Sequence, residues 1–300
     1  MDGVAAHAMD DPAAVVAPPG PAQLALALSV GSVALLMLGL QPLLLGALVD
    51  QGRLTVDQLG LAATAELLAL GATTGVLAGL LPAVRLRLIN GGACLGLAAA
   101  NIMSMLTSGY GFVAARALAG LASGMLVWIA VVMITRAKAP DRLAGIFLTA
   151  QTLAQAALAA VLPVTAMLRF GADGGLATLA ALALLGVAAS FLLQDQFAPL
   201  PKPEAAVSGL PWRGMAGLIS VFLYLAGIVG LWVFVERLGA RAGASATLAG
   251  IAVAAALAAQ VTGSSAARAA ATAIPANVAL APARAPSRST NTHKPTMPAR

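Results

Sequence analysis

The sequence predicts an all-α fold, a polytopic membrane protein built from a bundle of long helices. Hydrophobic residues make up 60% of the 300 residues and charged residues only 9%, whereas soluble domains carry about 25% charged residues. The hydrophobic residues also form eight runs of about twenty residues or more. A helix of that length, rising about 1.5 Å per residue, crosses a hydrocarbon core of about 30 Å.

The apolar runs follow one another with short connections, so we expect consecutive helices to be antiparallel neighbours. In chain order, the predicted helices cover 27–49, 59–81, 88–107, 113–135, 143–168, 175–194, 214–235 and 244–263. The stretch 195–213 is longer and rich in Pro, which is typical of a linker between two bundles. The predicted domains are a six-helix unit at 27–194, a cytoplasmic linker at 195–213, and two further helices at 214–263.

The two ends of the chain are predicted to be disordered. Residues 1–26 contain three Asp but no Lys or Arg, unlike the positively charged start of a signal peptide. Residues 264–300 are basic, and their longest uncharged run is too short and too interrupted by Pro to cross a membrane. Two interpretations of this second segment stay open: a genuine cytoplasmic tail, or out-of-frame translation of a gene whose remaining helices are lost.

Basic residues favour one orientation of the chain. One set of predicted loops holds seven of them and the opposite set holds four. The larger set is Arg85, Arg87, Arg136, Lys138, Arg142, Lys202 and Arg213, and the smaller set is Arg53, Arg169, Arg237 and Arg241. Because cytoplasmic loops carry an excess of Lys and Arg, we expect both termini in the cytoplasm and the helices in a bacterial inner membrane.

The residue types that the chain lacks exclude several classes of function. Cys94 is the only cysteine and lies in an apolar run, and the two histidines, His7 and His293, lie in the terminal segments. These positions exclude a disulfide framework, a Cys metal cluster and a His-dependent catalytic centre in the membrane. Nucleophile elbows, phosphate loops and basic stripes with interleaved aromatics are also absent. We therefore expect no enzyme activity, no metal, no cofactor and no nucleic-acid partner.

The fourth predicted helix combines a charge with a glycine face. Arg116 is followed by nineteen uncharged residues up to Thr135. Gly120 and Gly124 follow the Arg at steps of four, so they line one helix face on which another backbone can approach closely. Charge inside a membrane is rare unless it has a partner or a function. Arg116 is therefore a candidate functional residue.

Glu66, in the second predicted helix, is the strongest candidate for a titrating group. At about 100° per residue, Gly71, Gly75 and Gly79 fall on the face opposite Glu66, and Thr73 shares its face. We expect the helix to pack with its glycine face and to offer the carboxylate on the other. Two roles stay open: a proton-coupling or cation-binding site, or a structural carboxylate that is hydrogen-bonded to a neighbouring helix.

Glu66 and Arg116 are predicted to form an ion pair. Their helices enter the membrane from the same side, with Glu66 about 10 Å deep and Arg116 about 5 Å deep. Long side chains bridge that offset if the helices are neighbours. Two other roles for Arg116 stay open, which are binding an anionic substrate and anchoring the helix end at the lipid headgroups.

Five more polar or aromatic side chains lie inside predicted helices. They are Gln41, Asn101, Gln151, Gln155 and Tyr224. The four amides either line a polar cavity or hydrogen-bond between helices, and Gln151 and Gln155 share a face because they are four residues apart. Tyr224 is placed to stack on a substrate. Trp212 and Trp232 flank the seventh helix, and we interpret them as anchors in an aromatic belt.

Three stretches resemble the major facilitator superfamily of transporters, over about residues 27–263. Arg116-Ala-Leu-Ala-Gly120-Leu-Ala-Ser-Gly124 is similar to its fourth-helix motif, in which an Arg precedes glycines at helical spacing. The loop Gly79-Leu-Leu-Pro-Ala-Val-Arg85-Leu-Arg87 resembles its signature Gly-x-x-x-Asp-Arg-x-Gly-Arg, with Ala83 in place of the Asp and Leu86 in place of the second Gly. The stretch LGLQPLLLGALVDQGRLTVDQLGLAATAELL resembles its first two helices and the loop between them.

The resemblance implies a helical bundle of six helices from one half of a transporter and two from the other. Members usually have twelve helices in two halves, with the substrate near the midplane between them. It also implies secondary active transport of a small organic solute across the lipid bilayer, which we expect to be coupled to protons as a symport. The alternative is a non-transporting, truncated membrane protein or interaction scaffold that retains half of a transporter fold.

Overall fold

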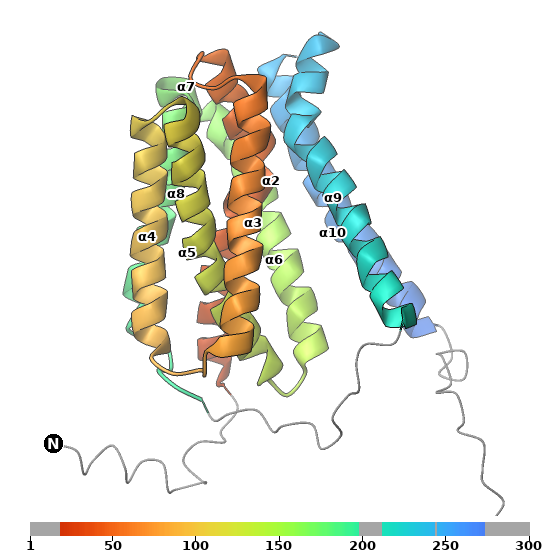
Figure 1. The fold of residues 1–300 in the computed structure, drawn as a ribbon. Helices are drawn as coiled ribbons and strands as arrows, with labels where there is room; N and C mark the ends of the chain where they lie inside the picture. The colour runs from red at the N-terminus through yellow and green to blue at the C-terminus, as the bar shows by residue number, and fades with distance from the viewer. Residues whose placement is uncertain (1–18, 198–211, 244, 274–300) are drawn as a thin grey trace, which may run out of the picture. The chain divides into compact units, whose positions relative to one another are not determined.

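The computed structural model describes residues 19–197, 212–243 and 245–273, which form long helices joined by short turns (Figure 1). The elements are α2 (Pro21–Asp50), α3 (Val56–Leu80), α4 (Leu86–Leu106), α5 (Gly109–Thr135), α6 (Pro140–Val161), the 3-10 turn η1 (Leu162–Val164), α7 (Ala166–Phe170), α8 (Ala172–Ser190), α9 (Trp212–Arg241) and α10 (Ala246–Ala273). Within these ranges there is no strand. Seven helices are long and apolar enough to cross a membrane, so the chain is an all-α polytopic membrane protein, as predicted.

Two predicted helices differ from the structure. The predicted span 143–168 is interrupted by η1, because Pro163 lacks the N–H that an uninterrupted helix would use. The eighth predicted span, 244–263, corresponds to α10, in which the apolar stretch among the described residues is Ile251–Gly263. The same helix continues to Ala273, ten residues into the segment predicted to be disordered. Residues 21–26, predicted to be disordered, form the start of α2, with Pro21 at its first turn. The predictions for 1–18, 198–211 and 274–300 fall outside the described residues.

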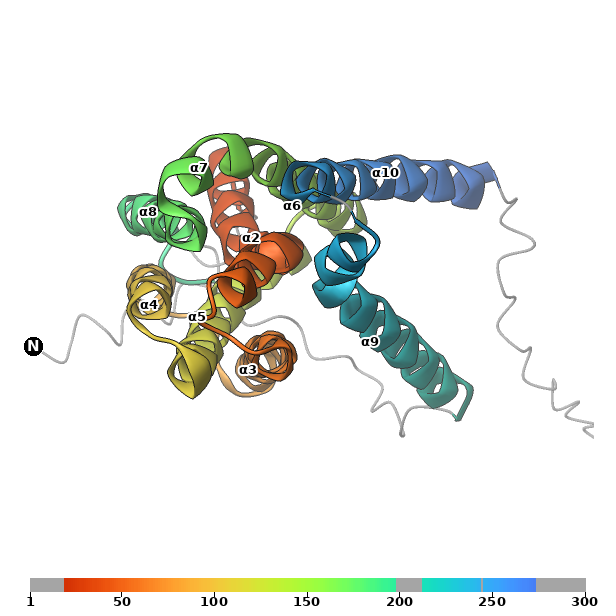
Figure 2. The same ribbon diagram turned by 90° about the horizontal axis from the view of Figure 1, so that it is seen from above.

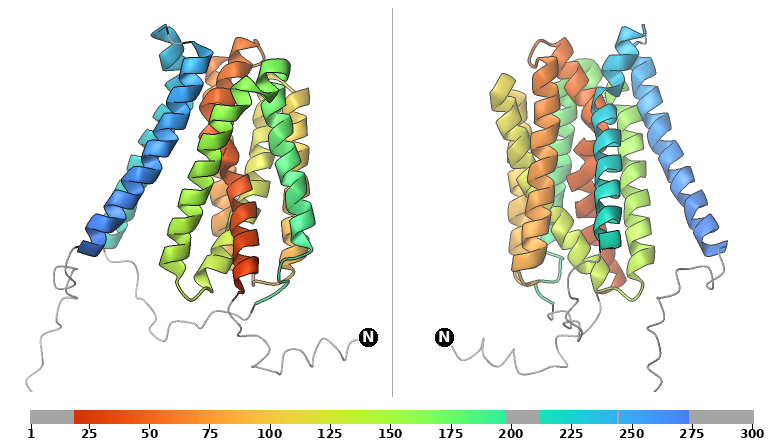
Figure 3. Two further views of the ribbon diagram at one scale, coloured as in Figure 1. Left: turned by 180° about the vertical axis from the view of Figure 1, so that it is seen from behind. Right: turned by 45° about the vertical axis from the view of Figure 1, so that its right-hand side comes forward.

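Helix α2 lies at the centre of the bundle. It packs against α5, α6 and α8, and Figure 2 shows these helices arranged around it. The left view of Figure 3 shows α2 between α6 and α8. Leu40, Leu44 and Leu48 of α2 are fully buried with Phe112 of α5. The closest packing of all is between α3 and α5, which run side by side along most of their length.

One end of the bundle is fastened by Arg53, in the turn between α2 and α3. Its Nη1 donates to Asp173 Oδ1 at the start of α8, at 2.6 Å. Its Nη2 donates to the carbonyl oxygens of Ser104, Met105 and Thr107, at 2.8, 2.7 and 2.8 Å. These carbonyls belong to the last turn of α4, which has no later N–H groups to bond. Arg53 thus joins three helix ends.

The opposite end is fastened by residues that follow α8. The Asp195 carbonyl accepts from Leu86 N at 2.8 Å, and Phe197 N donates to the Ala83 carbonyl at 2.9 Å. The Arg136 guanidinium lies over the Phe197 ring, 5.7 Å from its centroid. The first residues of the predicted linker are therefore fixed on the turn between α3 and α4 rather than running freely.

The second half of α9 packs on α2. Trp232 Nε1 donates to the Leu38 carbonyl at 3.2 Å, so the indole is bonded to α2, and its role as an anchor stays a prediction. Arg237 pairs with Asp50, with 2.8 Å between Nη1 and Oδ1. Residues 1–261 form one compact unit and 262–300 a second, and the described part of the second is the end of α10.

Candidate functional site

Arg116 and Glu66 form a buried ion pair between α5 and α3. Arg116 Nε donates to Glu66 Oε2 at 3.1 Å, and Arg116 Nη2 donates to Glu66 Oε1. Arg116 is 0% exposed and Glu66 is 4% exposed. The two parallel hydrogen bonds give the fork geometry in which a guanidinium and a carboxylate bind most strongly. The ion pair predicted from the sequence is therefore confirmed.

Asn101 of α4 completes the surroundings of the guanidinium. Arg116 Nη1 donates to Asn101 Oδ1 at 2.9 Å, and Asn101 is 2% exposed. The three guanidinium nitrogens thus bind groups from two neighbouring helices. Because a buried charge is tolerated only when it is paired and hydrogen-bonded, this geometry explains how Arg116 can lie inside an apolar bundle.

The glycines of α5 allow α3 to come close enough for the pair to form. A Cβ on Gly124 would lie 2.6 Å from the Leu70 carbonyl oxygen and 2.7 Å from Thr73 Cβ. A Cβ on Gly120 would overlap the Glu66 carbonyl oxygen. Only glycine fits at both positions, as small residues do wherever membrane helices pack backbone to backbone. The predicted close approach along Gly120 and Gly124 is confirmed.

The predicted use of the two faces of α3 is wrong. Gly71, Gly75 and Gly79 have nothing within 4 Å of a Cβ built on them, among the residues that the structure describes. The face of Glu66 and Thr73 is instead the one that packs on α5. The physical reason is that the glycines enabling the contact belong to α5, and the buried carboxylate must lie where its partner is.

Gln41 of α2 lies at the depth of the ion pair. A Cβ on Gly31 would lie 2.7 Å from Ala130 Cβ, which sets the register between antiparallel α2 and α5. Ten residues further along each helix, Gln41 is level with Gly120, whose backbone meets Glu66. Gln41 is 0% exposed, and neither its Oε1 nor its Nε2 has a hydrogen-bond partner among the described residues. A buried amide left unbonded is costly, so this position is suited to a polar ligand.

The two glutamines of α6 behave differently from each other. Gln155 Nε2 donates to the Leu35 carbonyl of α2 at 2.6 Å, which is the interhelical role that the sequence left open. Gln151 is 8% exposed, and its Oε1 lacks a partner in the described part of the chain. Sequence reasoning missed Ser123, which is 1% exposed with an unbonded Oγ. Its spacing of seven from Arg116, which places both on one face of α5, is the signal that would have found it.

The structure does not bring Tyr224 to this site. Tyr224 is 66% exposed on α9, and no described hydrogen bond joins it to Glu66 or Arg116. No group of three His, Cys, Asp or Glu side chains that could hold a metal ion occurs among the described residues. The site is therefore a buried charge cluster of Glu66, Arg116 and Asn101, with Gln41 at the same depth.

Comparison with known proteins does not assign this chain to a family. No family model matches the chain, and no curated protein matches it.

Proposed function

We propose that the chain is a secondary active transporter that couples movement of a small organic solute to protons. The observation that carries the proposal is the Glu66–Arg116–Asn101 cluster, which is fully enclosed by apolar helices. A proton arriving at the Glu66 carboxylate neutralises it and leaves the Arg116 charge buried with only Asn101 as partner. Removing one partner of a buried pair costs about 3–5 kcal/mol, so protonation favours a different arrangement of α3 and α5.

The chemistry of the freed guanidinium indicates the class of solute. Once Glu66 is protonated, the Arg116 guanidinium can donate two parallel hydrogen bonds to another carboxylate, in the same geometry that it has with Glu66. Gln41 supplies an unbonded donor and an unbonded acceptor at the same depth. A small organic anion entering with a proton satisfies all of these groups at once. The proposed mode is therefore proton symport of a small carboxylate.

The resemblance to the major facilitator superfamily supports the same proposal. Its fourth-helix motif corresponds to Arg116, Gly120 and Gly124, and these residues form the charge cluster and the close helix contact. In this proposal α2–α8 form the six-helix half, and α9 and α10 are the first two helices of the other half. The proposed location is a bacterial inner membrane with both termini in the cytoplasm, as the excess of basic residues in one set of loops favours.

Proton flux into proteoliposomes tests the coupling. The full chain is reconstituted with a pH-sensitive dye inside, and a panel of small carboxylates is added outside under an imposed pH gradient. We expect at least one carboxylate to accelerate acidification for the wild type and not for Glu66→Gln. The matched control is Asp57→Asn, which makes the same change of charge at an exposed position of the same helix. Flux that is equal in all three proteins overturns the assignment of Glu66.

We also consider a second function, a non-transporting protein that keeps the fold of one transporter half. The observation favouring it is α9, whose first half is exposed on all sides: Phe222, Leu223 and Tyr224 are 69, 63 and 66% exposed. Folded protein that shows no solute-dependent flux with any member of the panel supports this alternative. Sequencing the gene downstream of the codon for Gly263 in all frames then shows whether further apolar segments follow.

A further inference from the structure

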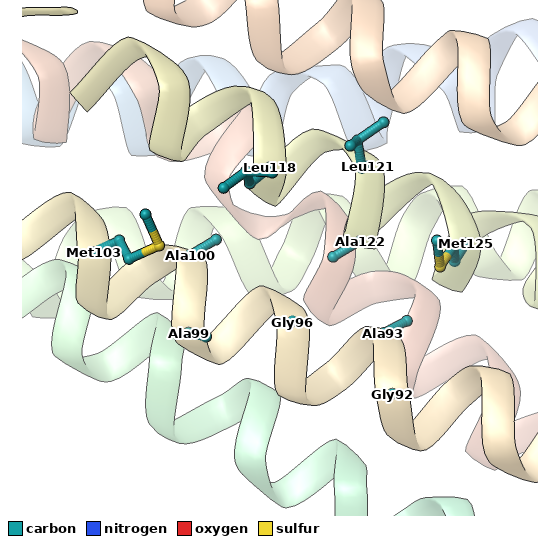
Figure 4. Close-up of a pocket in the computed structure, with 10 residues that line it drawn as sticks. All are labelled: Gly92, Ala93, Gly96, Ala99, Ala100, Met103, Leu118, Leu121, Ala122 and Met125. Atoms are coloured by element: carbon teal, nitrogen blue, oxygen red, sulfur yellow. The ribbon is translucent and has the colours of Figure 1, made fainter. Parts of the chain in front are cut away.

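An open groove runs between α4 and α5, and none of the charge-cluster residues lines it (Figure 4). Its volume is about 340 Å³, and all ten residues that line it are Gly, Ala, Leu or Met. Small residues of α4, including Gly92, Gly96 and Ala100, form one wall. A Cβ on Gly92 would meet nothing within 4 Å among the described residues. The groove is therefore a real hollow that is not filled by the chain's own side chains.

The groove opens away from the bundle, in the part of the chain that spans the membrane. The bulky residues at its rim are partly uncovered: Leu118, Leu121 and Met103 are 46, 43 and 41% exposed. From Gly92 to Met103 the wall rises eleven residues, or about 16 Å. One leaflet of a hydrocarbon core of about 30 Å is about 15 Å thick. The groove thus has the length and the polarity of one lipid acyl chain.

The N-terminal end of α4 carries a cation. Arg85 immediately precedes the helix and lies seven residues before Gly92, the first residue of the groove wall. It is exposed, and it caps the helix in the left-handed conformation, with φ of 55°. Residues other than glycine seldom adopt this conformation, and the bond from Leu86 N to the Asp195 carbonyl helps to hold it. The positive end of the α4 dipole adds to the charge of Arg85.

The surrounding charges at this end are mostly positive. Among the described residues, this end carries five basic side chains and two acidic ones. One of the acidic side chains, Asp195, already accepts a hydrogen bond from the backbone of α4. The basic residues are Arg85, Arg87, Arg136, Lys138 and Arg142, and the acidic ones are Asp141 and Asp195. A negatively charged headgroup is therefore attracted to the mouth of the groove.

We propose that the groove binds one acyl chain of an anionic phospholipid whose phosphate pairs with the Arg85 guanidinium. The phosphate oxygens accept hydrogen bonds from the Arg85 guanidinium, and the acyl chain fills the apolar hollow beyond it. A second copy of this protein docking on the same small residues is less favourable on charge. A two-fold axis along the membrane normal would bring the two Arg85 side chains together at one end, where like charges repel.

Native mass spectrometry of the full chain tests the proposal. The protein is kept in mixed micelles with equal amounts of phosphatidylglycerol and phosphatidylcholine, and bound lipids are counted. We expect one retained phosphatidylglycerol on the wild type. Arg85→Gln should reduce the preference for phosphatidylglycerol about fivefold, as loss of one interfacial cation implies. The matched control is Arg142→Gln, which removes an exposed cation at the same end of the bundle, outside the groove.

A second variant tests the groove without threatening the fold. Gly92→Leu places a side chain in the hollow, and Gly71→Leu, on the open face of α3, makes the same change away from it. We expect Gly92→Leu alone to lose the retained lipid of either headgroup. Equal lipid retention in both leucine variants overturns the groove as the binding site, and equal preference in Arg85→Gln and Arg142→Gln overturns the role of Arg85. A dimer that Gly92→Leu dissociates would show that a second copy occupies the groove, and would also overturn the proposal.

Discussion

Helices α5 and α9 are nearly equal in length and apolar character, yet their surroundings are opposite. Helix α5 is enclosed by α2, α3 and α4, and its Trp128 is 2% exposed. Among the described residues, helix α9 packs mainly against α2 and α3, and its Phe222 is 69% exposed. The glycines show the same contrast. Gly120 and Gly124 meet the backbone or side chains of α3, whereas Gly227 of α9 has no described neighbour within 4 Å of a Cβ.

An apolar run with glycines therefore does not by itself show where a helix is buried. A polar group is constrained only where neighbouring helices exclude both water and lipid, because only there must its hydrogen bonds come from the protein. Arg116 of α5 meets that condition and Tyr224 of α9 does not. Variants at matched positions on α5 and α9 therefore test whether the two helices differ in burial as described.

The largest expected effect on stability is at the ion pair of α5, compared with the ion pair of α9. Arg116→Met leaves the Glu66 carboxylate buried without its partner, and should lower the free energy of unfolding by about 3–5 kcal/mol. Arg237→Met, which breaks the pair between α9 and Asp50, should cost about 0–1 kcal/mol, because the Asp50 side chain is 61% exposed. Denaturant unfolding in detergent measures both.

A double-mutant cycle isolates the energy of the buried pair. The combination of Glu66→Gln with Arg116→Met should be less destabilising than the sum of the two single changes, because each single change leaves one buried charge unpaired and the double variant leaves none. Strict additivity would show that the pair contributes no coupling energy.

An intermediate effect is expected at the glycines. Gly120→Val drives a side chain into the Glu66 backbone and should destabilise the chain by about 3 kcal/mol. Gly227→Val, on the uncovered α9, should change stability by less than about 0.5 kcal/mol. Thermal unfolding of the two variants in the same detergent compares them. Equal losses would mean that α9 is as closely packed as α5.

The smallest effect on stability is expected at Gln41 and Tyr224. Gln41→Leu removes an unbonded buried amide and should raise stability by about 1 kcal/mol or leave it unchanged, while Tyr224→Leu should change it by less than about 0.5 kcal/mol. If Gln41 binds the solute, only Gln41→Leu should also reduce carboxylate-dependent proton flux in vesicles. Flux that is lost in Tyr224→Leu instead would place the solute on α9.

The fold class and the ion pair could be predicted from the sequence because both depend on quantities that one helix already contains. Length and composition determine that a segment can cross a membrane. The depths of Glu66 and Arg116 follow from counting residues along their helices. The spacing of Gly120 and Gly124 likewise identifies a face that another backbone can approach. Only the pairing itself also required α3 and α5 to be neighbours, which the sequence analysis left as a condition and the structure confirms.

The remaining features depend on which helix stands next to which face. Helical periodicity places Gly71 opposite Glu66, but it does not determine which of the two faces meets α5. Trp232 is a residue type that is common at membrane interfaces. Only the position of α2 shows that its N–H donates to the Leu38 carbonyl. The unbonded state of Gln41 is visible only once the bundle has closed around it.

The fastening of Asp195 and Phe197 has a mechanical consequence. Tension applied along the chain from beyond Phe197 reaches the turn between α3 and α4 before it reaches α8, because that turn holds both residues by backbone hydrogen bonds. The stacked Arg136 passes part of the same load to the end of α5. A pull on the bundle from this side therefore acts first on the helices that hold Glu66 and Arg116.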